Sequence, residues 1–342
     1  MRQIWITKAG PPEVLQVREA PDPTPGPGEV RIRVRAAGIN FADLMARVGL
    51  YPDAPKIPCV VGYEVSGVID AIGAEVTRFA VGDRVFGMPR FGGYTDTLVL
   101  SAAQVFRMPE RMTFEEGAAM PVVYLTAHHM MLFTGNLRRR SRVLIHSAAG
   151  GVGLAAIELA RTRDCEIYGV ASAGKHDFLR ERGCQHPIDS AADYAAEVMR
   201  ATGGKGVDLV LDAVGGKSWS HGYSLLAPAG RLVAFGLSAA ASGKERNLLH
   251  ALLQVMQIKR YSPRTLMDDN KTISGCNMGH LFGELAMLAE QFEALVALYE
   301  AGHIHPHVDR SFAFSDAAAA HHYLHDRKSK GKVLLVPDAI AA

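Results

Sequence analysis

The chain of 342 residues is long enough for two domains, because a single hydrophobic core stops growing at about 250 residues. Its 37 Lys and Arg nearly balance 35 Asp and Glu, so the formal charge of +2 gives no general attraction to nucleic acid or acidic lipid. Four widely spaced cysteines without a C-x-x-C pair, and no long uninterrupted apolar run, predict a cytoplasmic protein without disulfides or a membrane span.

The first 120 residues are expected to be mainly β-structure. Short segments alternate apolar and polar side chains, as in residues 29–38, where Val30, Ile32 and Val34 share one face. Similar segments follow at residues 65–73, 83–88 and 92–100. The Pro-rich and Gly-rich residues 21–28 are expected to form an exposed connection, because proline is compatible with neither a helix interior nor a central strand.

From Pro121 onward, apolar strand-length segments alternate with helix-length segments. This alternation predicts a parallel sheet covered by helices on both faces, which is a doubly wound α/β domain. The predicted strands are residues 142–146, 166–171, 207–214, 231–236 and 272–276. Residues 238–247 are expected to form a mobile loop.

The last part of the chain is expected to return to the first domain. It contains two helical segments, residues 281–301 and 315–327, and a final strand at residues 331–337. We therefore predict a β-rich domain made of residues 1–120 and 284–342, with a nucleotide-binding domain at residues 121–283 between them.

A strand, a Gly-rich turn and a helix follow one another in residues 142–160. Ala148, Gly150 and Gly153 occupy the small-residue positions of a G-x-G-x-x-G motif. Such a turn lets a pyrophosphate approach the backbone and presents the free N–H groups of a helix N-terminus. A tight turn of an ordinary α/β protein is the alternative, but the continued alternation of strands and helices favours a dinucleotide. The expected contact residues are Ala149, Gly150, Gly151, Val152 and Gly153.

The end of the second predicted strand indicates which dinucleotide is bound. Enzymes that use NAD place an acidic residue there to bind the ribose 2′-hydroxyl, whereas residues 169–177 offer Ser172 and Lys175. A hydroxyl and a cation suit a 2′-phosphate, so we expect NADPH rather than NADH. The alternative is that Lys175 is a solvated residue at a helix start.

Motifs along almost the whole chain resemble the zinc-free quinone oxidoreductases of the medium-chain dehydrogenase/reductase superfamily, and within it the vesicle amine transport protein branch. The segments that carry this resemblance are GINFADLMARVGLYP (38–52), GGYTDTLVL (92–100), VLIHSAAGGVG (143–153), ASAGKH (171–176), HPID (186–189), GYSLL (222–226), KERNLL (244–249) and ALYEAGHIHPH (297–307).

The resemblance implies a β-rich catalytic domain like chaperonin-10, a Rossmann nucleotide-binding domain, and an active site in the cleft between them. Zinc-dependent members of the superfamily use a Cys and a His as catalytic ligands. Asn40 and Tyr63 occupy those places here, and the lobe where relatives carry four cysteines has none, so no metal is expected.

The resemblance also places Asn40 and Tyr51 beside the nicotinamide and the substrate. For Asn40, a turn-capping role is an equally good interpretation, because asparagine is common in turns. Tyr51 combines an apolar ring with a polar tip, which suits a flat ligand. Asp43 and Arg47 are one helical turn apart and are expected to form a local ion pair.

Further cofactor contacts are implied by the resemblance alone. They are Tyr51, Thr126, Ser190, Phe235, Gly236, Leu237, Cys276 and Met278. Near relatives often have Tyr where Ser190 stands, which puts a contact at this position in doubt. The residues GHIHPHV, 302–308, could hold a metal if extended, but a surface strand is favoured.

These features predict an NADPH-dependent reductase of quinones or similarly activated carbonyl and alkene compounds, with the proton supplied by Tyr51 or by water. One alternative is a 2-alkenal or enoyl reductase. Another is an NADPH-binding membrane-traffic adaptor with little turnover, although no basic amphipathic helix is evident. By resemblance, we also expect a homodimer formed through the edge strand at residues 272–276.

Overall fold

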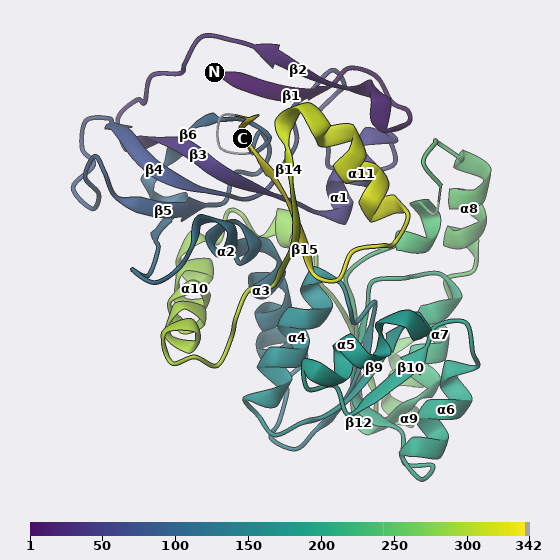
Figure 1. The fold of residues 1–342 in the computed structure, drawn as a ribbon. Helices are drawn as coiled ribbons and strands as arrows, with labels where there is room; N and C mark the ends of the chain where they lie inside the picture. The colour runs from purple at the N-terminus through teal and green to yellow at the C-terminus, as the bar shows by residue number, and fades with distance from the viewer. Residues whose placement is uncertain (242, 339–342) are drawn as a thin grey trace.

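The computed structural model describes residues 1–241 and 243–338. A β-rich unit lies above a parallel sheet wrapped by helices, and the helices α3 and α10 lie between them (Figure 1). Residue 242 of the expected loop and residues 339–342 of the expected catalytic domain lie outside the described residues.

The lower unit is built on six parallel strands, as expected for a doubly wound domain. Their order is β10-β9-β8-β11-β12-β13, so the direction of strand addition reverses between β8 and β11. Such a reversal creates a crevice at the carboxyl ends of the strands. The strands are β8 (Arg142–His146), β9 (Glu166–Ala171), β10 (His186–Asp189), β11 (Val207–Asp212), β12 (Leu226–Ala234) and β13 (Thr272–Gly275).

Both faces of this sheet are buried, which explains why its strands are almost continuously apolar. Along β8, Val143 and Ile145 join one core cluster, whereas Leu144 between them joins another. The helices of this unit are α4 (Gly151–Arg161), α5 (His176–Glu181), α6 (Tyr194–Ala201), α7 (Lys217–Ser224), α8 (Leu248–Met256) and α9 (Pro263–Asp269).

The strand β10 is missing from the sequence predictions. It has only four residues, and one of them is Pro187. Proline cannot donate a ladder hydrogen bond, so it argues against a central strand. The structure resolves the conflict by placing β10 at the edge of the sheet, where its neighbour is β9.

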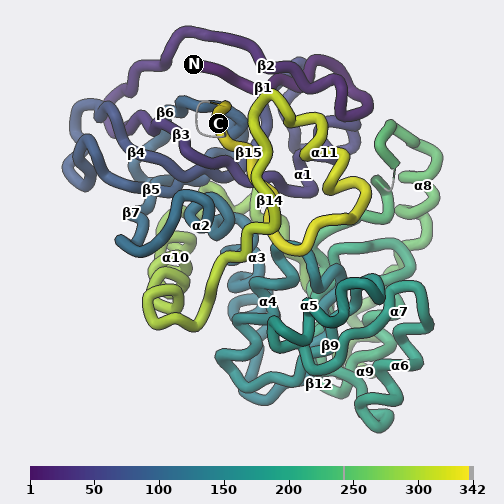
Figure 2. Tube along the Cα trace, viewed as in Figure 1, coloured from purple at the N-terminus to yellow at the C-terminus, as the bar shows by residue number. Residues whose placement is uncertain are grey.

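The upper unit contains strands from both ends of the described chain. One sheet has the order β14-β15-β3-β4-β5-β7, with β6 also pairing with β3, and β1 and β2 form a separate pair. The strands are β1 (Arg2–Ile6), β2 (Leu15–Glu19), β3 (Glu29–Ile39), β4 (Val65–Ile72), β5 (Arg84–Gly87), β6 (Thr97–Ser101), β7 (Val105–Arg107), β14 (Val308–Ala313) and β15 (Lys332–Val336). Figure 2 shows the yellow C-terminal segment returning beside the purple β3, where Leu335 pairs with Ala37.

Five more helices cover the upper unit or join it to the lower one. They are α1 (Phe41–Arg47), α2 (Phe114–Ala119), α3 (Pro121–His128), α10 (Leu285–Glu300) and α11 (Ala317–His325). A π-helix, η3 (His129–Thr134), extends α3. Short 3-10 turns occur at Pro12–Val14, Ala102–Gln104, Ala173–Lys175, Ser238–Ala241, Met278–His280 and Phe314–Asp316. Within residues 1–241 and 243–338, every helix is too short or too polar to cross a membrane.

The prediction of a surface strand at residues 302–308 is wrong for most of that segment. Residues 303–307 are irregular, and β14 begins only at Val308. His305 faces back to the carbonyl oxygen of Gly302, and His307 Nδ1 lies 2.8 Å from an Nη atom of Arg182. These two histidines therefore have separate partners.

Candidate active site

The Gly-rich turn connects the end of β8 to the start of α4. Gly150 caps the helix, and the first hydrogen bond of the helix runs from Leu154 N to Gly150 O at 2.9 Å. The N–H groups of Gly151, Val152 and Gly153 precede that bond. They therefore form a helix N-terminus suited to an anionic group such as a pyrophosphate.

Close packing explains why Gly153 is glycine. A Cβ atom at this position would lie 2.4 Å from the carbonyl oxygen of Ala148, which is backbone and cannot move aside easily. The left-handed conformation of the turn is adopted by Ser147, with φ of 54°, rather than by a glycine. Helix and strand thus approach each other as the motif predicts.

The other expected cofactor residues gather at the carboxyl edge of the same sheet. Cys276 N donates to Ala234 O at 2.9 Å, and Phe235 N donates to Asp212 O at 3.0 Å, which ties the ends of β11, β12 and β13 together. The residues that follow the strand ends are Ser172, Ser190, Phe235, Gly236, Leu237, Cys276 and Met278. Thr126 is buried on α3, which packs against α4.

Lys175 lies just before α5, but its ammonium group is not simply solvated. Its Nζ donates to the carbonyl oxygens of Arg327 at 2.8 Å and Ser329 at 2.6 Å. Burial lowers the pKa of Lys175, and the nearby charges of Lys330 and Arg327 lower it further. Lys175 therefore fastens the end of β9 to the connection between α11 and β15.

This connection was missed by the sequence reading. Arg327, Lys328 and Lys330 form a basic run immediately before β15. They are about 150 positions from Lys175 in the chain, and only the fold brings Arg327 and Lys330 near it. The basic run itself was the available signal.

Asn40 precedes α1 as its N-cap residue. Its backbone N–H donates to Asp43 Oδ2 at 2.8 Å, while its side chain makes separate contacts. Asn40 Nδ2 donates to Glu64 Oε1 at 2.8 Å, and Asn40 Oδ1 accepts from Lys332 Nζ at 2.7 Å. The capping position is therefore correct for the backbone of Asn40, whereas its amide belongs to a charged network.

Glu64 and Lys332 form a buried ion pair, with Nζ and Oε1 2.5 Å apart. The second oxygen of Glu64 accepts from Val122 N at 2.7 Å, at the start of α3. A Cβ atom at Gly38 would lie 2.4 Å from Glu64 Oε1, so this carboxylate requires glycine on β3. Sequence reasoning found neither partner of the pair, because Glu64, just before β4, and Lys332, at the start of β15, are far apart in the chain.

The expected local pair between Asp43 and Arg47 is wrong. Asp43 Oδ1 accepts from Gly62 N at 3.0 Å, in addition to the bond from Asn40 N. Arg47 instead donates to Gly10 O at 2.6 Å and lies 2.5 Å from His325 Nε2. Both side chains are fully buried and turn toward different elements, and burial raises the pKa of Asp43 to about 7.

Tyr51 belongs to an aromatic wall at the junction of the two units. The rings of Tyr51 and Tyr63 meet edge to face, with their centroids 6.5 Å apart. The ring centroids of Tyr63 and Phe91 are 5.2 Å apart. Burial raises the pKa of Tyr51, and the charge of Asp53 adds to this shift. The Tyr63 hydroxyl is buried and has no hydrogen-bond partner among the described residues.

A polar contact closes the same junction beside Tyr51. The carboxylate of Asp53 accepts from Asn277 Nδ2 at 3.1 Å and lies 3.0 Å from His280 Nε2. A Cβ atom at Gly279 would be 3.7 Å from the Tyr51 hydroxyl. The loop after β13 therefore lies directly against the segment that contains Tyr51 and Asp53, which we call the Tyr51 loop.

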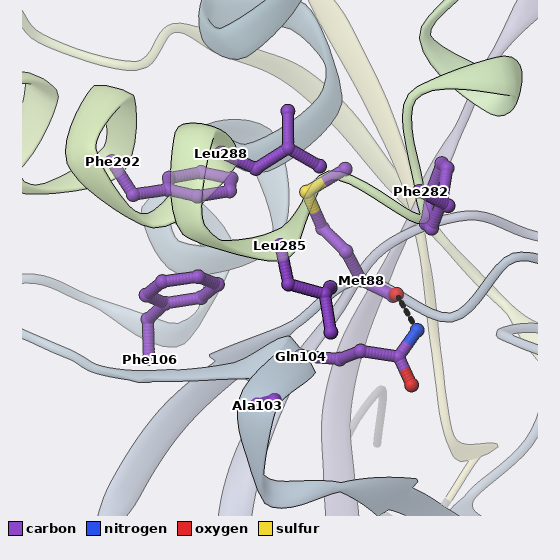
Figure 3. Close-up of a pocket in the computed structure, with 8 residues that line it drawn as sticks. All are labelled: Met88, Ala103, Gln104, Phe106, Phe282, Leu285, Leu288 and Phe292. Atoms are coloured by element: carbon purple, nitrogen blue, oxygen red, sulfur yellow. Dashed lines mark hydrogen bonds between the residues drawn. The ribbon is translucent and has the colours of Figure 1, made fainter.

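Figure 3 shows a separate apolar recess where α10 packs on the β-rich unit. Phe282, Leu285 and Leu288 point into it from one side, and Met88 and Phe106 point into it from the other. Its volume of about 10 Å³ holds roughly one water molecule, so the recess is too small for a quinone.

The donor set does not suit a metal ion. Within the described residues, 1–241 and 243–338, no three His, Cys, Asp or Glu side chains are grouped in a way that could hold one. The amide of Asn40 is already bound by Glu64 and Lys332, and burial raises the pKa of Tyr63 well above its usual range, which opposes a phenolate ligand.

Comparisons with known proteins identify the family and the fold of the chain. Residues 26–110 match the family model of the alcohol dehydrogenase GroES-like domain, and residues 182–335 match that of the zinc-binding dehydrogenase. The human synaptic vesicle membrane protein VAT-1 homolog is 42% identical over 325 residues, covering 94% of this chain and 82% of that protein. A quinone oxidoreductase of Pseudomonas aeruginosa is 34% identical over 339 residues, covering 98% and 99%.

Two solved structures extend the comparison. Escherichia coli quinone oxidoreductase complexed with NADPH superposes with a TM-score of 0.87 at 28% identity, covering 98% of this chain and 100% of that chain. The CurK enoyl reductase superposes with a TM-score of 0.85 at 27% identity, covering 98% and 99%. The chain thus resembles reductases that differ in the substrates their names give.

Proposed function

The chain belongs to the quinone oxidoreductase-like group of the medium-chain dehydrogenase/reductase superfamily, and from this premise we propose that it uses NADPH to reduce quinones, or similarly activated carbonyl and alkene compounds, without zinc. The observation that carries the proposal is the bond from Gly331 N to Ala149 O at 2.8 Å. It brings the start of β15, and with it Lys332 and Asn40, next to the Gly-rich turn.

NADPH fits the residues at the carboxyl edge of the parallel sheet. The free N–H groups at the start of α4 suit its pyrophosphate. The end of β9 has no acidic residue, and Lys175, Arg327 and Lys330 place positive charge there for a 2′-phosphate. Bound NADPH would supply the hydride, so the chain's own residues need only bind, orient and protonate the substrate.

The aromatic wall of Tyr51, Tyr63 and Phe91 suits a flat conjugated substrate. The raised pKa of Tyr51 keeps its phenol protonated up to alkaline pH, so Tyr51 can act as a hydrogen-bond donor to a substrate oxygen. The proton that completes the reduction comes from Tyr51 or from water.

Zinc independence is part of the proposal. It rests on the donor set, in which Asn40 and Tyr63 stand where zinc-dependent relatives carry Cys and His. Measuring the zinc content of active purified protein tests it, and activity that is lost with a chelator and regained with zinc would contradict it.

Steady-state assays test the reaction. We expect NADPH oxidation with 1,4-naphthoquinone and other quinones, and weaker or no oxidation of NADH. The similarity to the CurK enoyl reductase makes 2-alkenals and enoyl thioesters the necessary second panel. A strong preference for that panel would identify an alkenal or enoyl reductase instead.

A second candidate function is favoured by one helix. Large apolar side chains on α8 point to solvent along one stripe, with exposed fractions from 47% for Leu253 to 72% for Met256. The helix itself contains neither Lys nor Arg, but the exposed Arg246, Lys259 and Arg260 flank it. An apolar stripe beside basic residues suits an anionic membrane surface, and the VAT-1 homolog is named as a vesicle membrane protein. An NADPH-binding membrane adaptor would bind liposomes and show little turnover.

Homodimerisation in the cytoplasm is also part of the proposal. The strand β13 ends the order of the parallel sheet, with β12 as its neighbour among the described residues. An uncovered edge favours pairing with another chain. Sedimentation at micromolar concentration should give a dimer, and a monomer at all concentrations would contradict this.

A further inference from the structure

Asn40, Glu64 and Lys332 form a closed triangle of polar contacts. Asn40 Nδ2 donates to Glu64 Oε1, Lys332 Nζ donates to Asn40 Oδ1, and Lys332 Nζ also contacts Glu64 Oε1. Asn40 directly follows β3, Glu64 directly precedes β4, and Lys332 is the first residue of β15. Every pair in the triangle lies within 2.8 Å.

This triangle determines which way the Asn40 amide points. If the amide were turned by 180°, its NH₂ group would face the Lys332 ammonium, and its oxygen would face the Glu64 carboxylate. The first contact would place two donors face to face, and the second would place two acceptors face to face. A buried ion pair on one side of the amide therefore fixes a single orientation.

One N–H donor of the amide is left without a partner in this triangle. Asn40 Oδ1 is occupied by Lys332, whereas Nδ2 carries a second proton beyond the one given to Glu64. Glu64 is fully buried and Lys332 is 3% exposed, so Asn40 is the partly exposed member of the three. The triangle thus leaves one N–H of Asn40 for a ligand, while the Lys332 ammonium occupies one of the two lone pairs of Oδ1.

The triangle is also fixed relative to the Gly-rich turn. Gly331, the neighbour of Lys332, forms a bridge with Gly150 and donates to Ala149 O. The Lys332 side chain passes 3.8 Å from the position of a Cβ atom at Gly151. The orientation of Asn40 and the position of the turn therefore depend on the same strand.

We propose that Glu64 and Lys332 are positioning residues that lock the Asn40 amide as a hydrogen-bond donor for a carbonyl oxygen of the substrate. The inference rests on the proposed function. Hydride addition reduces a quinone by two electrons and leaves a negative charge on its oxygen, while the nicotinamide is oxidised to NADP⁺. The Asn40 N–H stabilises that charge, and water or Tyr51 then supplies the proton.

Side-chain NMR tests the orientation without any turnover. Selective ¹⁵N labelling of the five asparagines makes the two Nδ2 protons of Asn40 observable, and Asn40→Ala assigns them. We expect one proton to exchange slowly with solvent, because it is bonded to Glu64, and the other to exchange fast. Lys332→Met should speed the slow proton by at least about tenfold. Addition of 1,4-naphthoquinone with NADP⁺ should shift the fast proton.

Kinetics test the consequence. Lys332→Met should lower kcat for naphthoquinone by about a hundredfold while the Kd for NADPH stays unchanged. Lys332→Arg should restore much of the activity, since a guanidinium can still donate to Asn40 Oδ1. Glu64→Gln preserves size and should lower kcat as well, so it replaces Lys332→Met if that variant does not fold. Arg31→Met, which removes a partner of Asp70 on β4 far from the amide, is the matched control and should keep kcat.

Two results would overturn the inference. One is equal exchange of both Asn40 protons, unchanged in Lys332→Met. The other is a loss of NADPH affinity in Lys332→Met with kcat preserved, which would assign Lys332 to the cofactor alone. If the wild-type protein fails to oxidise NADPH with every quinone and enone, the proposed function is refuted. The exchange rates of the two Asn40 protons would still decide the orientation of the amide.

Discussion

The Asp53 carboxylate lies 3.0 Å from His280 Nε2, and this contact joins the Tyr51 loop of the β-rich unit to the loop after β13. Asn277 binds the same carboxylate. The contact is on the surface, where an ion pair contributes at most about 1 kcal/mol to stability. Its consequence is therefore expected in the position of Tyr51 rather than in the unfolding free energy.

Asp53→Ala should raise KM for a quinone several-fold and leave the unfolding free energy nearly unchanged. The hydrogen bonds from His280 and Asn277 hold the pKa of Asp53 below its usual range. The contact is therefore present at neutral pH. It is lost only when the pH falls through this lowered pKa, below the usual pKa range of an Asp. Kinetics and denaturant unfolding at pH 7 check this, with the exposed Asp177→Ala as control. An equal loss of stability in both variants, with KM unchanged, would contradict it.

Gly153→Ala should damage both stability and NADPH binding. The added Cβ would lie 2.4 Å from Ala148 O, and an overpacked position of this kind costs about 1–3 kcal/mol. The strain would also move the N-terminus of α4. The matched control is Gly283→Ala, because no atom lies within 4 Å of a Cβ there. Urea unfolding and fluorescence titration measure the two effects, and equal behaviour of the two variants would rule out the packing argument.

Lys175→Ala and Ser172→Ala should remove the preference for NADPH over NADH. A charge-assisted hydrogen bond to a phosphate is worth about 1.5–3 kcal/mol, so the Kd for NADPH should rise at least about tenfold in Lys175→Ala. The Kd for NADH should not change, because NADH has no 2′-phosphate. Lys205→Ala, an exposed lysine at another turn, is the control. Unaltered affinities would mean that Lys175 only fastens the α11–β15 connection through Arg327 and Ser329.

Local patterns predicted the nucleotide-binding half well, because its signals are local. The strand β8, the Gly-rich turn and α4 follow directly in the chain, and the packing at Gly153 agrees with the motif. The edge strand β10 was missed because Pro187 argues against a strand. The catalytic half depends on contacts between distant positions. Lys332 and Asn40 are 292 residues apart, and no local pattern links them.

The same reason explains the error at α1. A spacing of one helical turn predicts an Asp43–Arg47 pair only if both side chains lie on the helix surface. Both are buried, so each finds its partners in other elements: Arg47 donates to Gly10 O, and Asp43 accepts from Gly62 N. Burial, which the sequence of a short helix does not reveal, decided their partners.

Asp43 should make stability depend on pH near neutrality. Burial raises its pKa to about 7, above the unfolded value of 3.8. The folded state therefore holds this proton more tightly than the unfolded state. The contribution of Asp43 to the unfolding free energy is greatest below pH 4, falls as pH rises toward 7, and then levels off. The unfolding free energy of wild type minus that of Asp43→Asn should thus fall by roughly a few kcal/mol over this range. A flat difference would show that the bonds from Asn40 N and Gly62 N keep Asp43 ionised throughout.

The exposed stripe of α8 separates the two candidate functions. Leu249 is 69% exposed, so Leu249→Glu should change the unfolding free energy by less than about 0.5 kcal/mol. Val81→Glu is the matched control, since Val81 is 61% exposed and lies in the connection between β4 and β5. Figure 1 shows these two strands on the opposite side of the molecule from α8. If α8 docks on membranes, wild type and Val81→Glu will sediment with vesicles containing phosphatidylserine, and Leu249→Glu will stay in solution. If the chain acts only as a soluble reductase, none of the three will sediment, and all three will oxidise NADPH with naphthoquinone at the same rate. Vesicle binding that survives in Leu249→Glu would mean that another surface contacts the lipid, because a buried carboxylate at the centre of the stripe would oppose insertion of α8.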